Sequence, residues 1–172
     1  METTHNLIDT NHTHFLKNIS QYLETPLYFY GSIQRTDYIP NHSDIDIDIF
    51  SNDEILTMLK LQQHLHLEKK QFNPFVYKIY NNKVVRGHKI KYVNEDININ
   101  LELSIYNEKD KSDILVEHNR RNSLPFYVSF FLIIAKLLYY KCRIIPYSTY
   151  RYIKDFLMSF CIDGKFADFV VI

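Results

Sequence analysis

The sequence predicts an α+β fold, in which a mixed or antiparallel central sheet is flanked by helices and followed by a helical C-terminal part. Residues 44–50 and 97–105 alternate between apolar and polar with the two-residue period of strands, and from position 112 onward the apolar residues follow a helical period. The 172 residues fit one domain, and 3 Gly and 5 Pro predict short connections. We expect a flexible leader (1–12), a core (13–110) and a helical extension packed on the core (111–172).

The predicted helices are segments with apolar residues on one side. The first covers residues 13–23 and ends before Thr25-Pro26. The second is capped by Ser51-Asn52 and runs to about residue 67. Its expected apolar stripe consists of Ile55, Leu56, Leu59 and Leu65. The remaining helices are expected near residues 112–119, 125–141 and 148–160.

The predicted strands are short apolar or alternating runs bounded by turn residues. They cover residues 27–30, 44–50, 75–80, 84–93, 97–106 and 166–172. The apolar run at 126–140 is shorter than the roughly 20 residues that span a bilayer, and it contains Lys136. We therefore expect a buried helix there and no contact with a membrane.

Composition restricts the function classes. The chain has 20 Lys and Arg against 20 Asp and Glu, whereas a protein that holds nucleic acid through general positive charge would be more basic. Any nucleic-acid contact must be local. Cys142 and Cys161 are too few for a disulfide scaffold, and the first residues lack a secretory pattern, so we expect a reducing, cytoplasmic location.

The strand at 44–50 carries an unusual row of carboxylates. Its isoleucines alternate with Asp44, Asp46 and Asp48, which therefore share the other face. Like charges about 6.5 Å apart repel, and such a row is tolerated chiefly around a cation. An EF-hand calcium loop is excluded because Ile49 and Ile55 stand where it needs Gly and Glu.

Two further segments complete the pattern. Glu102 lies on the polar face of the strand at 97–106, and it would face the aspartates if the two strands were neighbours. Three carboxylates arranged in this way can hold two metal ions. Gly31-Ser32 follows a strand twelve residues before the acidic one, where backbone N–H groups and the Ser32 hydroxyl can bind an anion.

These residues resemble the signature of the nucleotidyltransferase superfamily built on the DNA polymerase beta fold. The resemblance rests on Gly31-Ser32 with Arg35, followed by Ser43-Asp44-Ile45-Asp46-Ile47, and it covers about residues 25–106. It implies a polymerase-beta-like core in which Asp44, Asp46 and Glu102 are catalytic and bind two Mg²⁺ ions, with Mn²⁺ as a substitute. The residues implied to bind the nucleotide and its phosphates are Gly31, Ser32, Arg35 and Ser43.

The implied reaction moves a nucleoside monophosphate, AMP from ATP in the first instance, onto a hydroxyl and releases pyrophosphate. The acceptor is a protein, an RNA end or a small molecule, and a separate protein partner is an open alternative. A catalytically silent nucleotide-binding or protein-interaction domain of the same fold is the second hypothesis. The presence of Ser32, Asp44, Asp46 and Glu102 together favours the enzyme.

Three departures from the family pattern leave alternatives open. The frequent Ala-Arg-Gly is replaced by Gln34-Arg35-Thr36. The third acid would be Glu102 where Asp is commoner, which leaves Asp96 as a competitor. Asp48 has no fixed family role and is either a charge behind the metal ligands or a surface residue.

The C-terminal third offers candidate contacts for a base or an acceptor. Tyr147, Tyr150, Arg151 and Lys154 fall near one helical face, where they can stack on a base and meet phosphates. The alternative is an ordinary amphipathic helix with half-buried tyrosines and solvated cations. Lys136 is a further candidate for the same role.

Overall fold

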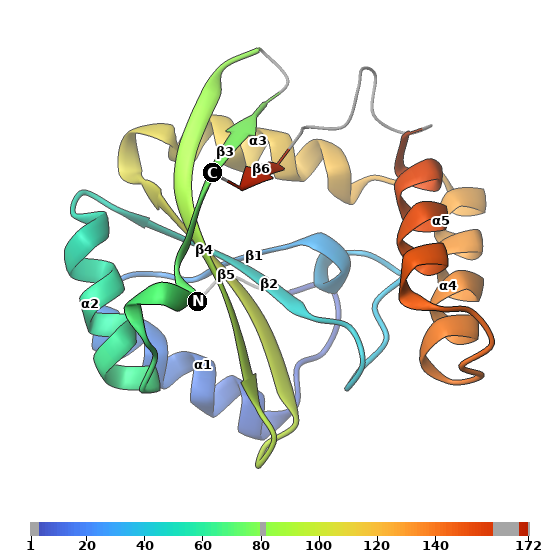
Figure 1. The fold of residues 1–172 in the computed structure, drawn as a ribbon, viewed down its shortest axis with the longest axis horizontal. Coiled ribbons are helices and arrows are strands. Elements are labelled where there is room, and N and C mark those ends of the chain that lie inside the picture. The colour runs from blue at the N-terminus through green and yellow to red at the C-terminus, as the bar shows by residue number, and fades with distance from the viewer. Residues whose placement is uncertain (1–3, 80–81, 160–168, 172) are drawn as a thin grey trace.

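The computed structural model describes residues 4–79, 82–159 and 169–171. Six strands form one sheet in the order β1-β2-β5-β4-β3-β6 (Figure 1). Their bounds are β1 Tyr28–Tyr30, β2 Ile45–Ser51, β3 Asn73–Lys78, β4 Val84–Asn94, β5 Ile99–Asn107 and β6 Phe169–Val171. β2 and β5 pair in parallel, whereas the other neighbouring strands pair antiparallel. The predicted α+β class with a mixed sheet is confirmed.

Helices cover both faces of the sheet, α1 and α2 on one side and α3 on the other (Figure 1). Within the described residues they are α1 Thr10–Leu23, α2 Glu54–Leu65, α3 Lys111–Asn122, α4 Phe126–Tyr140 and α5 Tyr147–Ser159, with short 3₁₀ turns η1 Gly31–Gln34, η2 Lys69–Gln71 and η3 Glu108–Asp110. The ends predicted at residues 80, 160, 166–168 and 172 lie outside the described residues.

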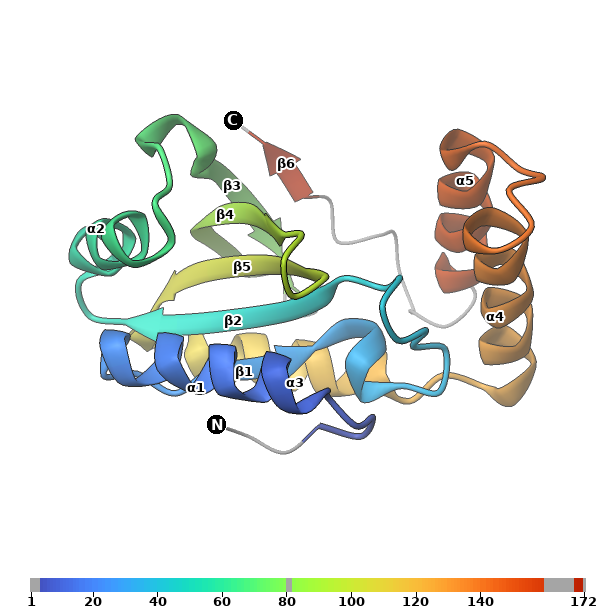
Figure 2. The same ribbon diagram turned by 90° about the horizontal axis from the view of Figure 1, so that it is seen from below.

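The main core lies between one face of the sheet and the helices α1 and α2. Ile47 on β2 and Leu103 on β5 are fully buried there beneath Leu16 of α1. A second apolar cluster on the opposite face joins Ile114 of α3 to Tyr106. α4 and α5 form a hairpin that stands beside the sheet (Figure 2). The hairpin faces the side of β2 that carries the acidic residues, since residues of both lie on one cavity.

The predicted apolar stripe of α2 is wrong. Ile55, Leu56 and Leu59 are exposed, and of the four expected residues only Leu65 is buried. The buried face is instead formed by Thr57, Leu61 and Leu65, which are four residues apart and therefore share one side of the helix. The hydroxyl of Thr57 donates to the Asp53 carbonyl at 3.0 Å, which satisfies this polar group at a buried position.

Asn6, which belongs to the expected leader, contacts the turn that follows β1. The Asn6 side-chain amide donates to the carbonyls of Ile33 and Arg35, at 2.9 and 2.6 Å. α1 already begins at Thr10, after the N-capping side chain of Asp9. Asn6 therefore braces η1 and Arg35, the residue that follows it.

No single helix among the described residues combines sufficient length with sufficient apolar character to cross a bilayer. The segments Glu108–Asn122 and Phe126–Tyr140 meet these two criteria only when taken together, and they are bent by 85° relative to each other.

Candidate active site

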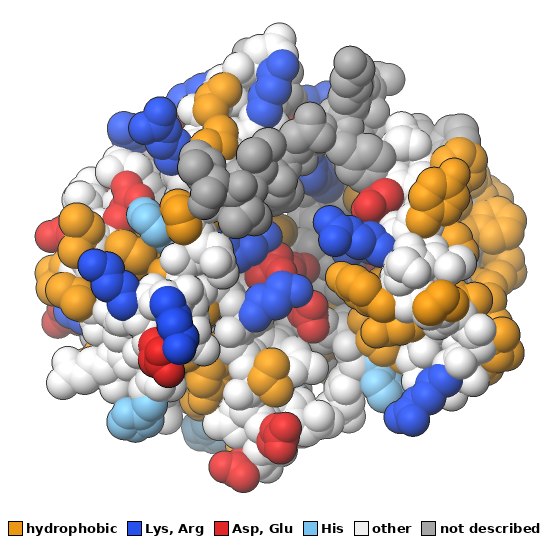
Figure 3. Space-filling model, in the orientation of Figure 1, with side chains coloured by type: hydrophobic (Ala, Val, Ile, Leu, Met, Phe, Trp, Pro, Cys, Tyr) orange, Lys and Arg blue, Asp and Glu red, His pale blue; other side chains and the backbone are white. Residues whose placement is uncertain are grey.

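A cavity of about 420 Å³ lies between the polar side of the sheet and the α4–α5 hairpin. Acidic and basic side chains gather around this hollow in Figure 3. The residues that the sequence predicted for the site all line it: Gly31, Ser32, Arg35, Ser43, Asp44, Asp46, Glu102, Lys136, Tyr150, Arg151 and Lys154. Segments that are far apart in the sequence therefore meet at one place.

The acidic residues meet because β2 and β5 are neighbours. Asp46 and Glu102 are direct partners in the parallel register, and the strands are about 4.8 Å apart. Both side chains point from the same face of the sheet into the cavity. Asp44, the residue immediately before β2, also lines the cavity. Asp96, the competing third acid, lies exposed in the β4–β5 turn and is not part of the cavity wall.

The turn after β1 lies against the carboxylate of Asp46. Gly31 has a φ of +71°, and a Cβ at this position would collide with the Asp46 carboxylate oxygen. Only glycine fits this backbone, for reasons of both conformation and space. Ser32 follows in η1 and is buried at the cavity wall. The turn that contains Gly31-Ser32 therefore packs directly against Asp46 on the acidic strand.

The three carboxylates differ in the direction in which their surroundings shift the pKa. Removal from water and the neighbouring Glu102 raise the pKa of Asp46 to about 7. Removal from water also raises the pKa of Asp44, with the Lys91 charge acting against it. For Glu102, burial is outweighed by Lys89 and Lys91, and its pKa falls below the ordinary value.

Sequence reasoning missed the two lysines of β4. Lys89 Nζ lies 2.6 Å from one oxygen of Glu102, and Lys91 Nζ lies 3.4 Å from the other. Lys91 is the antiparallel register partner of Glu102. The alternation of Lys89 and Lys91 around Ile90 was visible in the sequence, but it has meaning only once β4 is known to pair with β5.

Asp48 is a buried charge behind the cavity and not a surface residue. Its side chain is 0% exposed, and its Oδ2 lies 2.6 Å from Nε2 of His118 on α3. Burial raises the pKa of Asp48, and the His118 contact opposes this rise. The His118 ring stacks on Tyr30 with centroids 4.1 Å apart. His118 and Arg121 also line the cavity, and neither was predicted.

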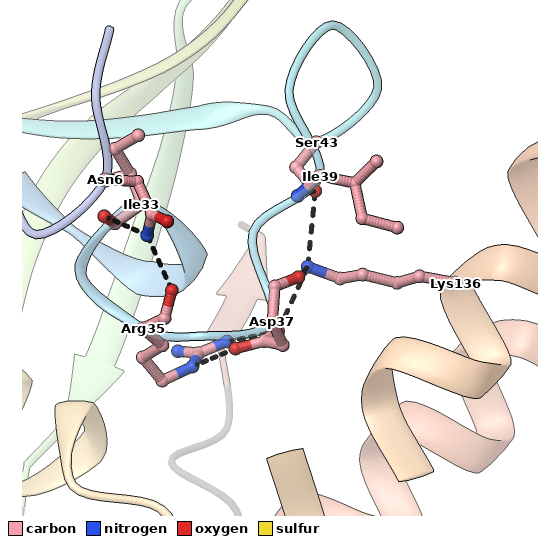
Figure 4. A network of polar contacts seen from close by, with 7 residues as sticks. All are labelled: Asn6, Ile33, Arg35, Asp37, Ile39, Ser43 and Lys136. Carbon is pink, nitrogen blue, oxygen red and sulfur yellow. Dashed lines mark hydrogen bonds and ion pairs between the residues drawn. The ribbon is translucent and has the colours of Figure 1, made fainter. Parts of the chain in front are cut away.

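Figure 4 shows a buried polar network that ties the hairpin to the loop before β2. Lys136 of α4 donates to the Asp37 carbonyl at 2.6 Å and to Ser43 Oγ at 3.2 Å, and it lies 3.0 Å from Asp37 Oδ2. Arg35 Nε donates to Asp37 Oδ1 at 2.8 Å. Through these contacts Lys136 positions Ser43, the residue before Asp44. No motif in the sequence predicted that Asp37 would join this network.

The wall opposite the carboxylates comes from α5. Tyr147, Arg151 and Lys154 line the cavity on the exposed side of this helix, as their spacing predicted. Tyr150 is buried and stacks on Tyr139 of α4 with ring centroids 4.9 Å apart. The ring of Tyr150 therefore belongs to the hairpin packing as well as to the cavity wall.

No protein-family model matches this sequence, and no curated protein matches it with statistical significance. The assignment of chemistry therefore depends on the geometry of the cavity.

The donor set of the cavity fits a hard cation. Carboxylate oxygens are the ligands that Mg²⁺ prefers, and Asp44, Asp46 and Glu102 bring such oxygens to one cavity. Among the described residues, no group of three or more His, Cys, Asp or Glu side chains already surrounds a common point. In Glu102 the oxygens contact lysine ammonium groups, so metal binding requires Lys89 to give way.

Proposed function

We propose that the protein is a metal-dependent nucleotidyltransferase that moves AMP from ATP onto a hydroxyl group with release of pyrophosphate. The observation that supports this most is the meeting of three elements: Asp46 on β2, Glu102 beside it on β5, and the Gly31 turn against the Asp46 carboxylate. A phosphate-binding turn next to a carboxylate cluster suits a substrate that carries both phosphates and metal ions. A cytoplasmic location, where ATP and Mg²⁺ are present, is part of the proposal.

Asp44, Asp46 and Glu102 would hold two Mg²⁺ ions, which supply charge neutralisation of the triphosphate and a lower pKa for the acceptor hydroxyl. Ser32 and the backbone at Gly31 would hold the terminal phosphates. The acceptor oxygen attacks the α-phosphorus in line as the bond to the bridging oxygen breaks. Pyrophosphate leaves, and the hydroxyl proton passes to the carboxylate cluster. The protein contributes by positioning and by electrostatic stabilisation.

The side of the cavity formed by α5 suits an acceptor that is anionic or has a flat base. Tyr147 offers an exposed ring, and Arg151 and Lys154 offer cations on the same side of the helix. Aromatic rings stack on bases of any sequence, and nearby cations bind phosphates. A protein, an RNA end and a small molecule all remain acceptors to be tested.

Pyrophosphate release tests the proposal. The purified chain is incubated with Mg²⁺, each of the four nucleoside triphosphates and a panel of acceptors. We expect release by the wild type and loss of at least about 100-fold in Asp46→Asn, in line with the removal of an essential electrostatic group. Asp96→Asn is the matched control, because Asp96 is an exposed acid outside the cavity. Equal release by wild type and Asp46→Asn would refute the assignment.

The second candidate is a silent domain that binds a nucleotide without transferring it. The contacts of Glu102 with Lys89 and Lys91 favour it, because they neutralise one of the three carboxylates without a metal. This candidate predicts that ATP raises the melting temperature of the wild type while no acceptor becomes labelled. Transfer that depends on Asp46 excludes it.

A further inference from the structure

The outer side of the α4–α5 hairpin carries an apolar surface that its own chain leaves exposed. On α4 four aromatic side chains point away from the core: Phe126, Tyr127, Phe130 and Phe131 are 86, 48, 57 and 51% exposed. They occupy adjacent positions of the helix, because residues three and four apart are neighbours on its surface. Figure 3 shows apolar side chains gathered over this part of the molecule.

The opposite side of α4 makes the contacts that hold it in the molecule. Val128, Leu132 and Lys136 are buried on that side. Among the residues that the structure describes, the first two form a cluster with Met158 alone as the third buried member. The hairpin thus has a small core of its own. Its aromatic outer face is not needed for attachment to the sheet.

α5 carries two further exposed aromatic rings on the same hairpin. Tyr152 and Phe156 are 72 and 52% exposed and stack on each other, with ring centroids 6.5 Å apart. At about 200 Å² for a whole aromatic side chain, the six rings together expose about 700 Å². The largest apolar patch of a typical monomer is about 300–600 Å². A stable pair of proteins buries about 800 Å² on each partner, which is close to what these rings offer.

We propose that a second copy of this chain covers this surface, so that two α4–α5 hairpins form a four-helix bundle. A two-helix hairpin with apolar outer faces is half of such a bundle, and two copies related by a twofold axis present the same face to each other. The face requires no charge complementarity, because Lys136 is the only charged residue between Phe126 and Tyr140 and it is buried.

The same lack of charge argues against a bilayer as the occupant. Helices that lie on membranes carry Lys and Arg along their polar flanks, where they meet lipid headgroups. In α4 the buried ammonium of Lys136 is held by Asp37 and Ser43 on the side that faces the core. Dimerisation does not depend on the proposed activity, so the two proposals can fail separately.

Analytical ultracentrifugation of the full chain tests the proposal. We expect a dimer for the wild type at micromolar concentration and a monomer for the double variant Phe130→Glu/Phe131→Glu. The matched control is Ile55→Glu/Leu59→Glu on α2, whose side chains are 67 and 55% exposed. It should remain dimeric. Circular dichroism melts confirm that each variant is folded.

A cysteine crosslink tests the orientation. Ile134 lies one turn after Phe130, near the middle of α4, where two antiparallel copies would cross. In a chain with Cys142→Ser and Cys161→Ser, Ile134→Cys should form an intermolecular disulfide under mild oxidation, and Phe130→Glu/Phe131→Glu should abolish it. A folded wild type that stays monomeric, whether or not it sediments with anionic vesicles, overturns the proposal. So does a dimer that only the α2 control disrupts.

Discussion

Asp46 and Glu102 are register partners on the two parallel strands of the sheet, and their side chains enter the same cavity. Of these carboxylates, Glu102 contacts two lysines, whereas Asp46 has its pKa raised to about 7 by its surroundings. Burial and the Glu102 charge therefore disfavour the ionised form of Asp46, whereas the lysines favour that of Glu102. A divalent cation would stabilise the ionised Asp46, which is why the pair is central to the proposed function.

Removing the Asp46 charge should stabilise the metal-free protein. In Asp46→Asn the negative charge that is partly withdrawn from water disappears, and so does its repulsion with Glu102. We expect the free energy of unfolding at pH 8 in EDTA to rise by about 1–2 kcal/mol, less than the full pKa shift implies, because solvent in the open cavity screens the charge. Urea denaturation measures it, and Mg²⁺ should stabilise the wild type alone. A less stable Asp46→Asn protein would contradict this account of the cavity.

Gly31→Ala should damage the site and the fold together. The new Cβ would meet the Asp46 carboxylate, and alanine is strained at a φ of +71°. We expect a loss of about 1–3 kcal/mol in the free energy of unfolding and loss of ATP binding. Ser32→Ala keeps the backbone, so it should weaken ATP binding with little effect on stability. Calorimetry separates the two effects, and an unchanged melting temperature for Gly31→Ala would show that the contact is absent.

Lys89→Met should change metal and nucleotide affinities in opposite directions. Its ammonium group occupies the Glu102 oxygen that a cation would use, at 2.6 Å. Without this competitor, Mg²⁺ or Mn²⁺ should bind several-fold more tightly, whereas ATP should bind more weakly because a cation of the cavity is lost. Isothermal titration calorimetry measures both. Lys70→Met serves as the control, since Lys70 is exposed and pairs with Glu68 instead.

Lys136→Met should destabilise the protein through the network of Figure 4. It leaves the buried Asp37 carboxylate with Arg35 as its remaining cation in that network. Breaking a buried ion pair typically costs about 3 kcal/mol. Lys141→Met, at an exposed position after the same helix, should change the free energy of unfolding by less than about 0.5 kcal/mol. Equal effects of the two substitutions would show that the network adds nothing.

The same variant has a predicted pH dependence. Burial raises the pKa of Asp37, but Arg35 and Lys136 outweigh it and hold the pKa below its usual value. The ionised Asp37 therefore stabilises the fold above about pH 4, and this contribution is lost as pH falls through the lowered pKa. The stability gap between wild type and Lys136→Met should shrink between pH 7 and pH 3. A constant gap would indicate that only packing was lost.

Local patterns in the sequence were enough to predict the fold class and to show which carboxylates share a face of the sheet. Strand alternation put Asp44 and Asp46 on one face, and the same argument placed Glu102, so local pattern was enough once β2 and β5 became neighbours. Lys89 and His118 were missed because their roles depend on long-range pairing, with β5 and with Asp48. In α2, the prediction assigned the buried face to the most apolar residues and was wrong. Thr57 lies on the buried face instead, because its hydroxyl donates to the nearby Asp53 carbonyl.

Parallel reactions with ATP labelled at the α- or the γ-phosphorus test the central claim most directly. A nucleotidyltransferase leaves the α-label on the acceptor and releases the γ-label with pyrophosphate. We predict α-label on an acceptor in the presence of Mg²⁺, no γ-label on it, and loss of the signal in Asp46→Asn but not in Asp96→Asn. Transfer of the γ-label, or α-label that persists in Asp46→Asn, would contradict the account.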